Sequence, residues 1–403
     1  MKYIVILGDG MADYPIEQLG NRTPLQVANK PNMDYLAQHG RVGLVKTTPD
    51  GMKPGSDNTN MGIMGFDPLK YYTGRSPLEA MSMGISMKDS DVSYRVNLVT
   101  LGGDEEYSNK TMLDYSADEI STEESGELIR YLAQHFNDEH FTLYPGISYR
   151  HCMIWANGET GQMLTPPHDI LEQNIAEYLP KGSAGNVFFD MMRRSYELLK
   201  DHPVNKARMQ RGLKPANSIW PWGEGKRPAF PSFEELHGKK GAVISAVDLI
   251  KGIGICAGMR VMEVEGATGN IHTNFKGKAE AALDALKDGA DYVYLHVEAP
   301  DECGHRQEIE SKVRAIELID EHIVGRILRE MKEAKQEFRM LLMPDHPTPL
   351  MLRTHTSDAV PFVLYASTQE LQPHVEKYDE GHAKATGIFE EHAYKLIDFL
   401  MDK

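Results

Sequence analysis

The chain has 403 residues, of which 41% are hydrophobic and 8% aromatic; this is ordinary for a globular protein and allows two or three domains with sizeable cores. Its formal net charge of −16 makes nucleic acid and anionic membranes unfavourable partners, although a local basic pocket would still accept a small phosphorylated substrate. Three cysteines without a C-x-x-C pair exclude a thiolate zinc site and indicate a reducing, cytoplasmic environment.

The first elements in chain order are those of a parallel sheet. Residues 2–8 form a continuous apolar run that ends in Gly-Asp-Gly, as a buried parallel strand does. This run reads as a strand rather than a signal peptide, and no apolar run approaches the roughly 18 residues of a membrane span. Residues 31–40 begin with Pro and end with Gly, which predicts a helix, and residues 42–46 read as a short strand.

The second half of the chain repeats this alternation. Further strands are predicted at 241–246, 260–264, 291–299, 339–345 and 360–366, and helices at 277–288, 309–334 and 386–402. Alternating strands and helices predict an α/β sandwich around a mostly parallel sheet.

The middle of the chain differs from both ends. Residues 87–236 are rich in acidic and loop-forming stretches, among them "ADEISTEESGE" and "NSIWPWGEGKRPAFPSF". We interpret 87–236 as an α+β domain inserted into a discontinuous domain made of 1–86 and 237–403, with boundaries near Met87 and Leu236.

Acids and histidines gather where predicted strands end. In open α/β sheets ligands bind at the carboxyl ends of the strands, so these separate segments are expected to converge. Singly, such an Asp is often a helix cap and such a His an ordinary core or surface residue. Together, carboxylates and imidazoles without thiolates suit manganese, zinc or iron, and six ligands suit two ions. The six residues are Asp9, Asp301, His305, Asp345, His346 and His355.

A serine follows a turn in "PDGMKPGSDNTNM". Ser56 is either the N-cap of a helix or a nucleophile at a helix N-terminus, where N–H groups favour a phosphoryl group. No histidine neighbours it in the sequence, so activation by a divalent ion is a better hypothesis than a Ser-His-Asp triad. We find no P-loop and no Rossmann fingerprint.

Cationic side chains in the insert suit recognition of phosphate or carboxylate, because guanidinium groups bind both by paired hydrogen bonds. The candidates are Arg95, Arg150, His151 and His168, with Lys251 and Lys278 as weaker candidates outside the insert.

The segments "GDGMAD", "RTPLQVANKPNMDYLAQHG", "PGSDNTNMGIMGFDP", "YYTGRSPLEA", "VEAPDECGH", "PDH" and "THTSDAVPF" resemble the archaeal-type, cofactor-independent phosphoglycerate mutases of the alkaline phosphatase-like metalloenzyme superfamily. The likeness covers nearly the whole chain. It implies a two-metal, phosphatase-like α/β/α domain and an inserted substrate-binding lid. Pro347, where many members have Gly, makes the chain more similar to a bacterial branch labelled putative homoserine kinase.

The resemblance implies the ligand set residue by residue. One ion would be held by Asp9, Ser56, Asp345 and His346, and the other by Asp301, His305 and His355. Manganese is the family's usual metal, with zinc or cobalt as alternatives. Ser56 would carry a phosphoserine intermediate while 3-phosphoglycerate and 2-phosphoglycerate interconvert, a step of glycolysis and gluconeogenesis.

Two alternatives remain open from the sequence. A homoserine kinase-like phosphotransferase would use the same site but needs a nucleotide site, for which no motif is recognisable. A non-catalytic metal-binding module would not require Ser56 beside a complete ligand set.

Overall fold

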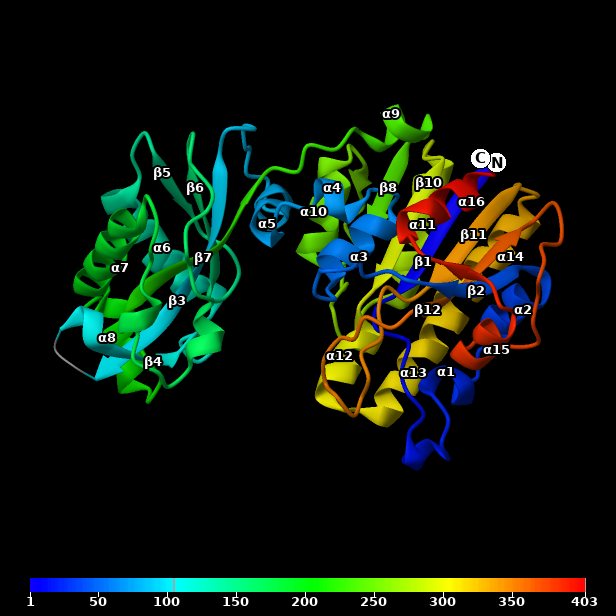
Figure 1. Cartoon of the computed structure of the whole chain (residues 1–403), viewed down its shortest axis with the longest axis horizontal. Coiled ribbons are helices and arrows are strands. Elements are labelled where there is room, and N and C mark those ends of the chain that lie inside the picture. The colour runs from blue at the N-terminus through cyan, green and yellow to red at the C-terminus, as the bar shows by residue number, and fades with distance from the viewer. Residues whose placement is uncertain (104–105, 403) are drawn as a thin grey trace. The chain divides into compact units, whose positions relative to one another are not determined.

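The computed structural model describes residues 1–103 and 106–402, which form two compact units (Figure 1). Unit 1 comprises residues 1–72 and 230–402, and unit 2 comprises Thr73–Ala229. The predicted boundaries near Met87 and Leu236 therefore lie 14 and 7 residues further along the chain than the observed ones. The first differs because α5 (Arg75–Ser82) packs against two strands of unit 2.

Within the described residues, unit 1 is built on an eight-stranded sheet of order β13-β2-β12-β11-β1-β10-β8-β9. All of its strands run in one direction except β12, which is antiparallel to both neighbours. The strands are β1 (Lys2–Gly8), β2 (Arg41–Val45), β8 (Gly241–Ile244), β9 (Arg260–Val261), β10 (Tyr292–Val297), β11 (Phe338–Met343), β12 (Val360–Ala366) and β13 (Phe389–Glu390).

Helices cover both faces of this sheet, because its central strands are apolar on both sides. Ile4 and Ile6 of β1 pack with residues of α2, α11, α13 and α14, whereas the alternate residues Val5 and Leu7 face the layer that holds α3, α10 and α16. The helices are α1 (Pro24–Val27), α2 (Pro31–His39), α3 (Ser56–Ile63), α4 (Pro68–Tyr71), α9 (Phe233–His237), α10 (Asp248–Cys256), α11 (Phe275–Lys287), α12 (Ala299–Arg306), α13 (Ile309–Ile319), α14 (Gly325–Glu333), α15 (Glu380–Ala385) and α16 (Leu396–Met401). The predicted α/β sandwich with a mostly parallel sheet is confirmed.

Two predicted helices differ from the structure. The helix expected at 309–334 is divided by one π-helical segment, Asp320–Val324, between α13 and α14. The prediction of a helix at 386–402 was wrong for the first half of this range. Gly387 adopts a left-handed backbone conformation there, and the chain then forms β13 beside β2. Only α16, after one 3₁₀ turn, is helical there.

Unit 2 contains an antiparallel sheet of five strands within its described residues. Its elements besides α5 are β3 (Val92–Gly103), β4 (Lys110–Asp114), β5 (Phe141–Tyr144), β6 (Arg150–Trp155), β7 (Ser218–Lys226), α6 (Thr122–Phe136), α7 (Gly185–Leu199) and α8 (Pro203–Gln210). α6 and α7 pack on the sheet through apolar residues such as Leu128 and Phe188.

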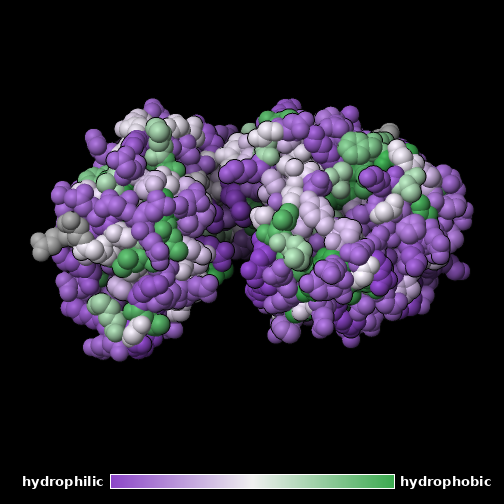
Figure 2. All heavy atoms as spheres, turned by 60° about the horizontal axis from the view of Figure 1, so that its bottom comes forward, coloured by the Kyte–Doolittle hydropathy of each residue, from purple (hydrophilic) through white to green (hydrophobic). Residues whose placement is uncertain are grey.

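The face drawn in Figure 2 is mostly hydrophilic, with apolar residues scattered in small patches. The large apolar side chains instead fill the cores of the two units. Among the described residues, no helix combines the length and the apolar character needed to cross a membrane.

Candidate active site

The chemistry-bearing residues of unit 1 come together at one edge of its sheet. Asp9 follows β1, Asp345 and His346 follow β11, and Asp301 lies on α12, just beyond β10. β1, β10 and β11 are adjacent and parallel, so their carboxyl ends meet at this edge. The reversed strand β12 begins at the same edge, and the loop that leads into it carries His355.

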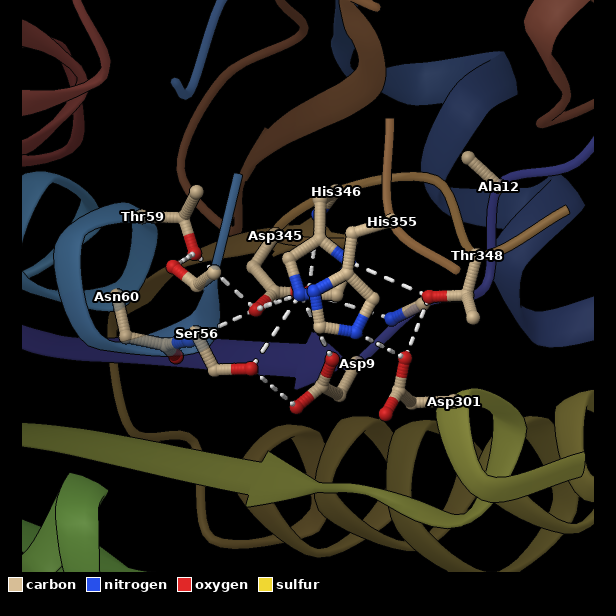
Figure 3. Close-up of polar contacts among 12 residues, drawn as sticks. Asp9, Ala12, Ser56, Thr59, Asn60, Asp301, Asp345, His346, Thr348 and His355 are labelled. Atoms are coloured by element: carbon tan, nitrogen blue, oxygen red, sulfur yellow. Dashed lines mark hydrogen bonds and ion pairs between the residues drawn. The ribbon is translucent and has the colours of Figure 1, made fainter. Parts of the chain in front are cut away.

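Ser56 lies beside the first of these carboxylates. Its Oγ is 3.4 Å from Asp9 Oδ2 and 3.3 Å from His346 Nε2 (Figure 3). Ser56 is the first residue of α3, and the N-cap position belongs to Gly55, which has no side chain to cap the helix. The serine hydroxyl is therefore not required as a helix cap.

Asp345 is held by four hydrogen bonds. Its Oδ2 accepts from Asn60 Nδ2 at 2.8 Å and Thr59 Oγ1 at 3.2 Å, and its Oδ1 accepts from the N–H groups of His346 and Gly10. Gly10 has φ of +62°, and a Cβ there would lie 2.8 Å from Asp301 Oδ1. This position requires glycine, which lets two acid-bearing segments approach each other closely.

A second group surrounds Asp301. Its carboxylate oxygens lie 3.2 Å from His305 Nε2 and 3.3 Å from His355 Nε2, and it accepts a short hydrogen bond from Thr348 Oγ1. The His355 ring stacks on that of His346, with centroids 3.8 Å apart (Figure 3).

The acids perturb one another. Burial raises the pKa of Asp9 well above its usual value, and the charges of Asp345 and Asp301 add to this. Burial acts in the same way on Asp301, but hydrogen bonds from His305 and His355 outweigh it and lower the pKa of that carboxyl group well below its usual value. The hydrogen bond to Asp301 raises the pKa of His305 to about 9.

The donor set fits divalent cations. Two groups have all their ligand atoms within 4.8 Å of one another: Asp301, His305 and His355 form one, and Asp9, Asp301 and His346 the other. His305 Nε2 and His355 Nε2 approach to 2.9 Å, and the buried Asp9 Oδ1 has no hydrogen-bond partner among the described residues. A cation would satisfy that oxygen and offset the repulsion among the acids.

Sequence reasoning missed His296, which is completely buried on β10 and lies with its Nε2 2.9 Å from Asp9 Oδ2. The only signal was a histidine within an otherwise apolar strand. It also missed Lys312 on α13, whose Nζ donates to Asp13 Oδ2 at 2.7 Å and to the carbonyl oxygen of Thr348 at 2.8 Å. The helical pattern of the sequence does not show that the Lys312 side chain is buried and pairs with Asp13, about 300 positions away.

The two lysines suggested for a phosphate site have protein partners in the structure. Lys251 forms an ion pair with Glu263 at 2.8 Å. Lys278 is fully buried on α11 and donates to the carbonyl oxygen of His296 at 3.0 Å. Burial lowers the pKa of Lys278 to about 8.

In unit 2 two other arginines lie close enough to Arg95 to act on its charge. Burial lowers the pKa of Arg95, and the charges of Arg75 and Arg150 act in the same direction, against Glu79. Arg95 pairs with Glu79 at 3.0 Å and stacks 4.3 Å above the Trp222 ring. Sequence reasoning missed Arg75, the first residue of α5.

The two histidines proposed for unit 2 differ in their surroundings. His168 is half-exposed and contacts the Trp222 ring, with centroids 5.2 Å apart. His151 is buried; its Nδ1 accepts from the Gly146 N–H, and its Nε2 has no hydrogen-bond partner among the described residues. Burial lowers the pKa of His151 to about 3, so its ring is neutral.

The chain is similar to known proteins over its full length. Residues 37–205 match the family model described as 2,3-bisphosphoglycerate-independent phosphoglycerate mutase. A probable 2,3-bisphosphoglycerate-independent phosphoglycerate mutase of Geobacter sulfurreducens is 50% identical over 100% of both chains. The enzyme of that name from Methanosarcina barkeri is 49% identical over 100% of this chain and 99% of the relative.

Two solved structures match the chain over its full length. The PH0037 protein of Pyrococcus horikoshii matches with a TM-score of 0.84 at 28% identity, covering 100% of this chain and 96% of the other. The cofactor-independent phosphoglycerate mutase of Thermoplasma acidophilum matches with a TM-score of 0.69 at 25% identity, covering 100% and 99%. By its identity to full-length relatives, the chain belongs to the family of 2,3-bisphosphoglycerate-independent phosphoglycerate mutases.

Proposed function

We propose that this enzyme interconverts 3-phosphoglycerate and 2-phosphoglycerate through a phosphoserine on Ser56, with two divalent metal ions. The observation that carries the proposal is the place of Ser56, whose hydroxyl lies 3.4 Å from Asp9 and 3.3 Å from His346, beside the convergent acids and histidines. The names of its relatives support the substrate.

The proposed ions divide the donors into two sets. Manganese is the preferred metal, with zinc or cobalt as alternatives. Bound divalent ions would lower the pKa of the serine hydroxyl and offset the negative charge of a phosphoryl group. One ion is assigned to Asp9, Ser56, Asp345 and His346, and the other to Asp301, His305 and His355.

The chain's own residues account for the transfer. Ser56 Oγ forms a bond to phosphorus as the ester P–O bond of the substrate breaks, and the leaving oxygen takes up the proton that the serine hydroxyl has lost. The first turn of α3 favours the negative charge beside Ser56. The glycerate then takes the phosphoryl group from Ser56 on its other hydroxyl. These two transfer steps use neither water nor a nucleotide. They therefore yield an isomer only if the glycerate stays bound between them.

We assign retention of the glycerate to unit 2. The charges of Arg75 and Arg150 both act against that of Arg95, and an anion would relieve that repulsion. His151 and His168 are candidates to contact the hydroxyl oxygens of the substrate, and the roles of Lys251 and Lys278 at the phosphate stay predictions. Unit 2 would then act as a lid that excludes water.

The test is direct. Purified protein with Mn²⁺ should convert 3-phosphoglycerate to 2-phosphoglycerate, and ³¹P NMR measures this product. The protein in a quenched sample should gain the mass of one phosphoryl group, located on Ser56. The comparison is an incubation with homoserine and ATP. If homoserine is phosphorylated and 3-phosphoglycerate is not isomerised, the protein is a kinase and the proposed mutase function is wrong. A cytoplasmic, glycolytic role is our prediction from the same assignment.

The metal assignment has its own test. His355→Ala should bind about one equivalent of Mn²⁺ where the wild type binds two, because it loses a ligand of the Asp301 group. His374→Ala, on an exposed loop of the same unit, is the matched control. Equal metal content in both variants would refute the role of His355.

A further inference from the structure

Three side chains form a row across three neighbouring strands behind the proposed metal site. Ser245 follows β8, His296 lies on β10 and Asp9 follows β1. His296 is completely buried, with its Nδ1 3.1 Å from Ser245 Oγ and its Nε2 2.9 Å from Asp9 Oδ2. Lys278 fixes the backbone of this position by donating to the His296 carbonyl oxygen.

The direction of these hydrogen bonds follows from the partners. The ionised Asp9 carboxylate, the form that binds a metal ion, can only accept, so His296 Nε2 carries the hydrogen and donates to Asp9 Oδ2. In the neutral imidazole Nδ1 then carries no hydrogen and accepts from Ser245 Oγ. Ser245 Oγ in turn accepts from the N–H of Val247 at 2.9 Å.

This arrangement makes the two oxygens of Asp9 unequal. Oδ2 accepts from His296 and faces Ser56, whereas Oδ1 is buried without a hydrogen-bond partner among the described residues. A carboxylate held through one oxygen presents the other in a fixed direction, which is how partners beyond the ligands tune metal sites.

We propose that Ser245 and His296 are positioning residues that orient Asp9, so that Oδ1 is the atom offered to the metal ion. The inference rests on the proposed metal site but concerns residues outside its ligand set. Neither residue touches the substrate in this proposal; both act through Asp9.

Two substitutions of one side chain separate orientation from simple packing. In His296→Gln the amide nitrogen reaches the place of Nε2 and still donates to Asp9. In His296→Asn the shorter amide reaches only the place of Nδ1 and keeps Ser245 as its partner. The Asn variant should bind Mn²⁺ about 10- to 100-fold more weakly than wild type. The Gln variant should stay close to wild type, with thermal midpoints of both metal-free variants recorded as the control for folding.

Equal Mn²⁺ affinity of the two variants overturns the proposal, whether both resemble wild type or both are weakened. If neither variant folds, the ring ¹⁵N shifts of ¹⁵N-histidine-labelled, metal-free wild type decide: hydrogen on Nε2 of His296 supports the proposal, and hydrogen on Nδ1 overturns it. Wild type that binds no Mn²⁺ would instead refute the proposed metal site, and the tautomer would still test the row of hydrogen bonds.

Discussion

At the scale of one residue, the contacts of Ser56 bear on two possible roles, helix cap and nucleophile. Its hydroxyl contacts side chains of Asp9 and His346 and caps no helix, since Gly55 occupies the N-cap position. The capping interpretation, which the sequence left open, is therefore wrong. The nucleophile interpretation stays a prediction with a clear experiment.

Ser56→Ala should leave stability nearly unchanged, because losing a true N-cap costs only about 1 kcal/mol and no cap is lost here. Turnover should fall by several orders of magnitude, on the order of 10³-fold or more, because no oxygen remains to accept the phosphoryl group. The measurements are kcat with 3-phosphoglycerate and the thermal midpoint. A kcat within tenfold of wild type rules out the nucleophile role.

The convergence of the ligand candidates was predictable because each is an acid or imidazole close to a predicted strand end, and the carboxyl ends of neighbouring parallel strands meet at one edge of a sheet. His296 was not predictable in this way. It lies inside the predicted strand 291–299, and nothing in the pattern shows that its ring meets Asp9 rather than the core. Arg75 was missed because exposed arginines are common and the sequence does not show that this one lies near Arg95.

At the scale of elements, a buried ion pair joins three segments around the site. Lys312 on α13 is fully buried, and its ammonium bonds to Asp13 in the loop after β1 and to the Thr348 carbonyl oxygen after β11. Asp13 also accepts from the N–H of Leu350. Loops that carry Asp9 and Asp345 are thus fixed to one helix.

Lys312→Met should destabilise the protein by about 3–5 kcal/mol, because it leaves the buried carboxylate of Asp13 without its cation. The double variant Asp13→Asn with Lys312→Met should recover part of that loss, since an amide tolerates burial without a counter-charge. Denaturant unfolding of metal-free protein measures both. A double variant less stable than Lys312→Met would contradict the ion-pair explanation.

Glu380, at the start of α15, gives a pH dependence of known sign. Its carboxyl oxygens accept from the Asp13 N–H and from Thr23 Oγ1, and burial of the group raises its pKa from 4.5 to about 7. In the unfolded chain the carboxyl group ionises near 4.5. Its contribution to stability is therefore present below that pH and is lost as the pH rises to about 7.

Glu380→Gln keeps an acceptor for Asp13 but cannot ionise. Between about pH 4.5 and 7 the free energy of unfolding of wild type should fall relative to that of this variant. Denaturant titrations at half-unit pH steps make the comparison. Parallel pH profiles would show that the carboxyl group has an ordinary pKa.

For the whole molecule, the sequence predicted the class of fold but not the order of strands. Alternating elements indicate a parallel sheet, yet they do not state that β1 lies between β10 and β11, because that pairing joins residues about three hundred positions apart. The insert boundary was missed for a related reason. The helix in the segment 73–86, α5, packs on β3 and β7 of unit 2, and a pattern along the chain does not show such packing.

The two units are proposed to have different roles, metal binding in unit 1 and retention of the glycerate in unit 2. The ratio of released phosphate to isomerised substrate can test this. All seven proposed metal ligands lie in unit 1, whereas Arg150 lies in unit 2, exposed beside the Tyr149 ring. If Arg150 holds the glycerate, its loss costs a charged hydrogen bond of roughly 1.5–3 kcal/mol, or about 10- to 100-fold in escape. Water then competes for the phosphoserine, because the intermediate outlives the bound glycerate.

Arg150→Ala should therefore isomerise 3-phosphoglycerate more slowly while releasing more inorganic phosphate for each molecule isomerised. The matched control is Arg193→Ala, which removes an exposed arginine of the same unit that pairs with Asp190 at 2.8 Å. Both variants should keep wild-type Mn²⁺ content, since neither residue belongs to the ligand sets. A ratio of released phosphate to isomerised substrate equal to that of wild type would mean that retention does not depend on Arg150. An equal rise in both variants would point to a general change in unit 2 rather than to a contact with the glycerate.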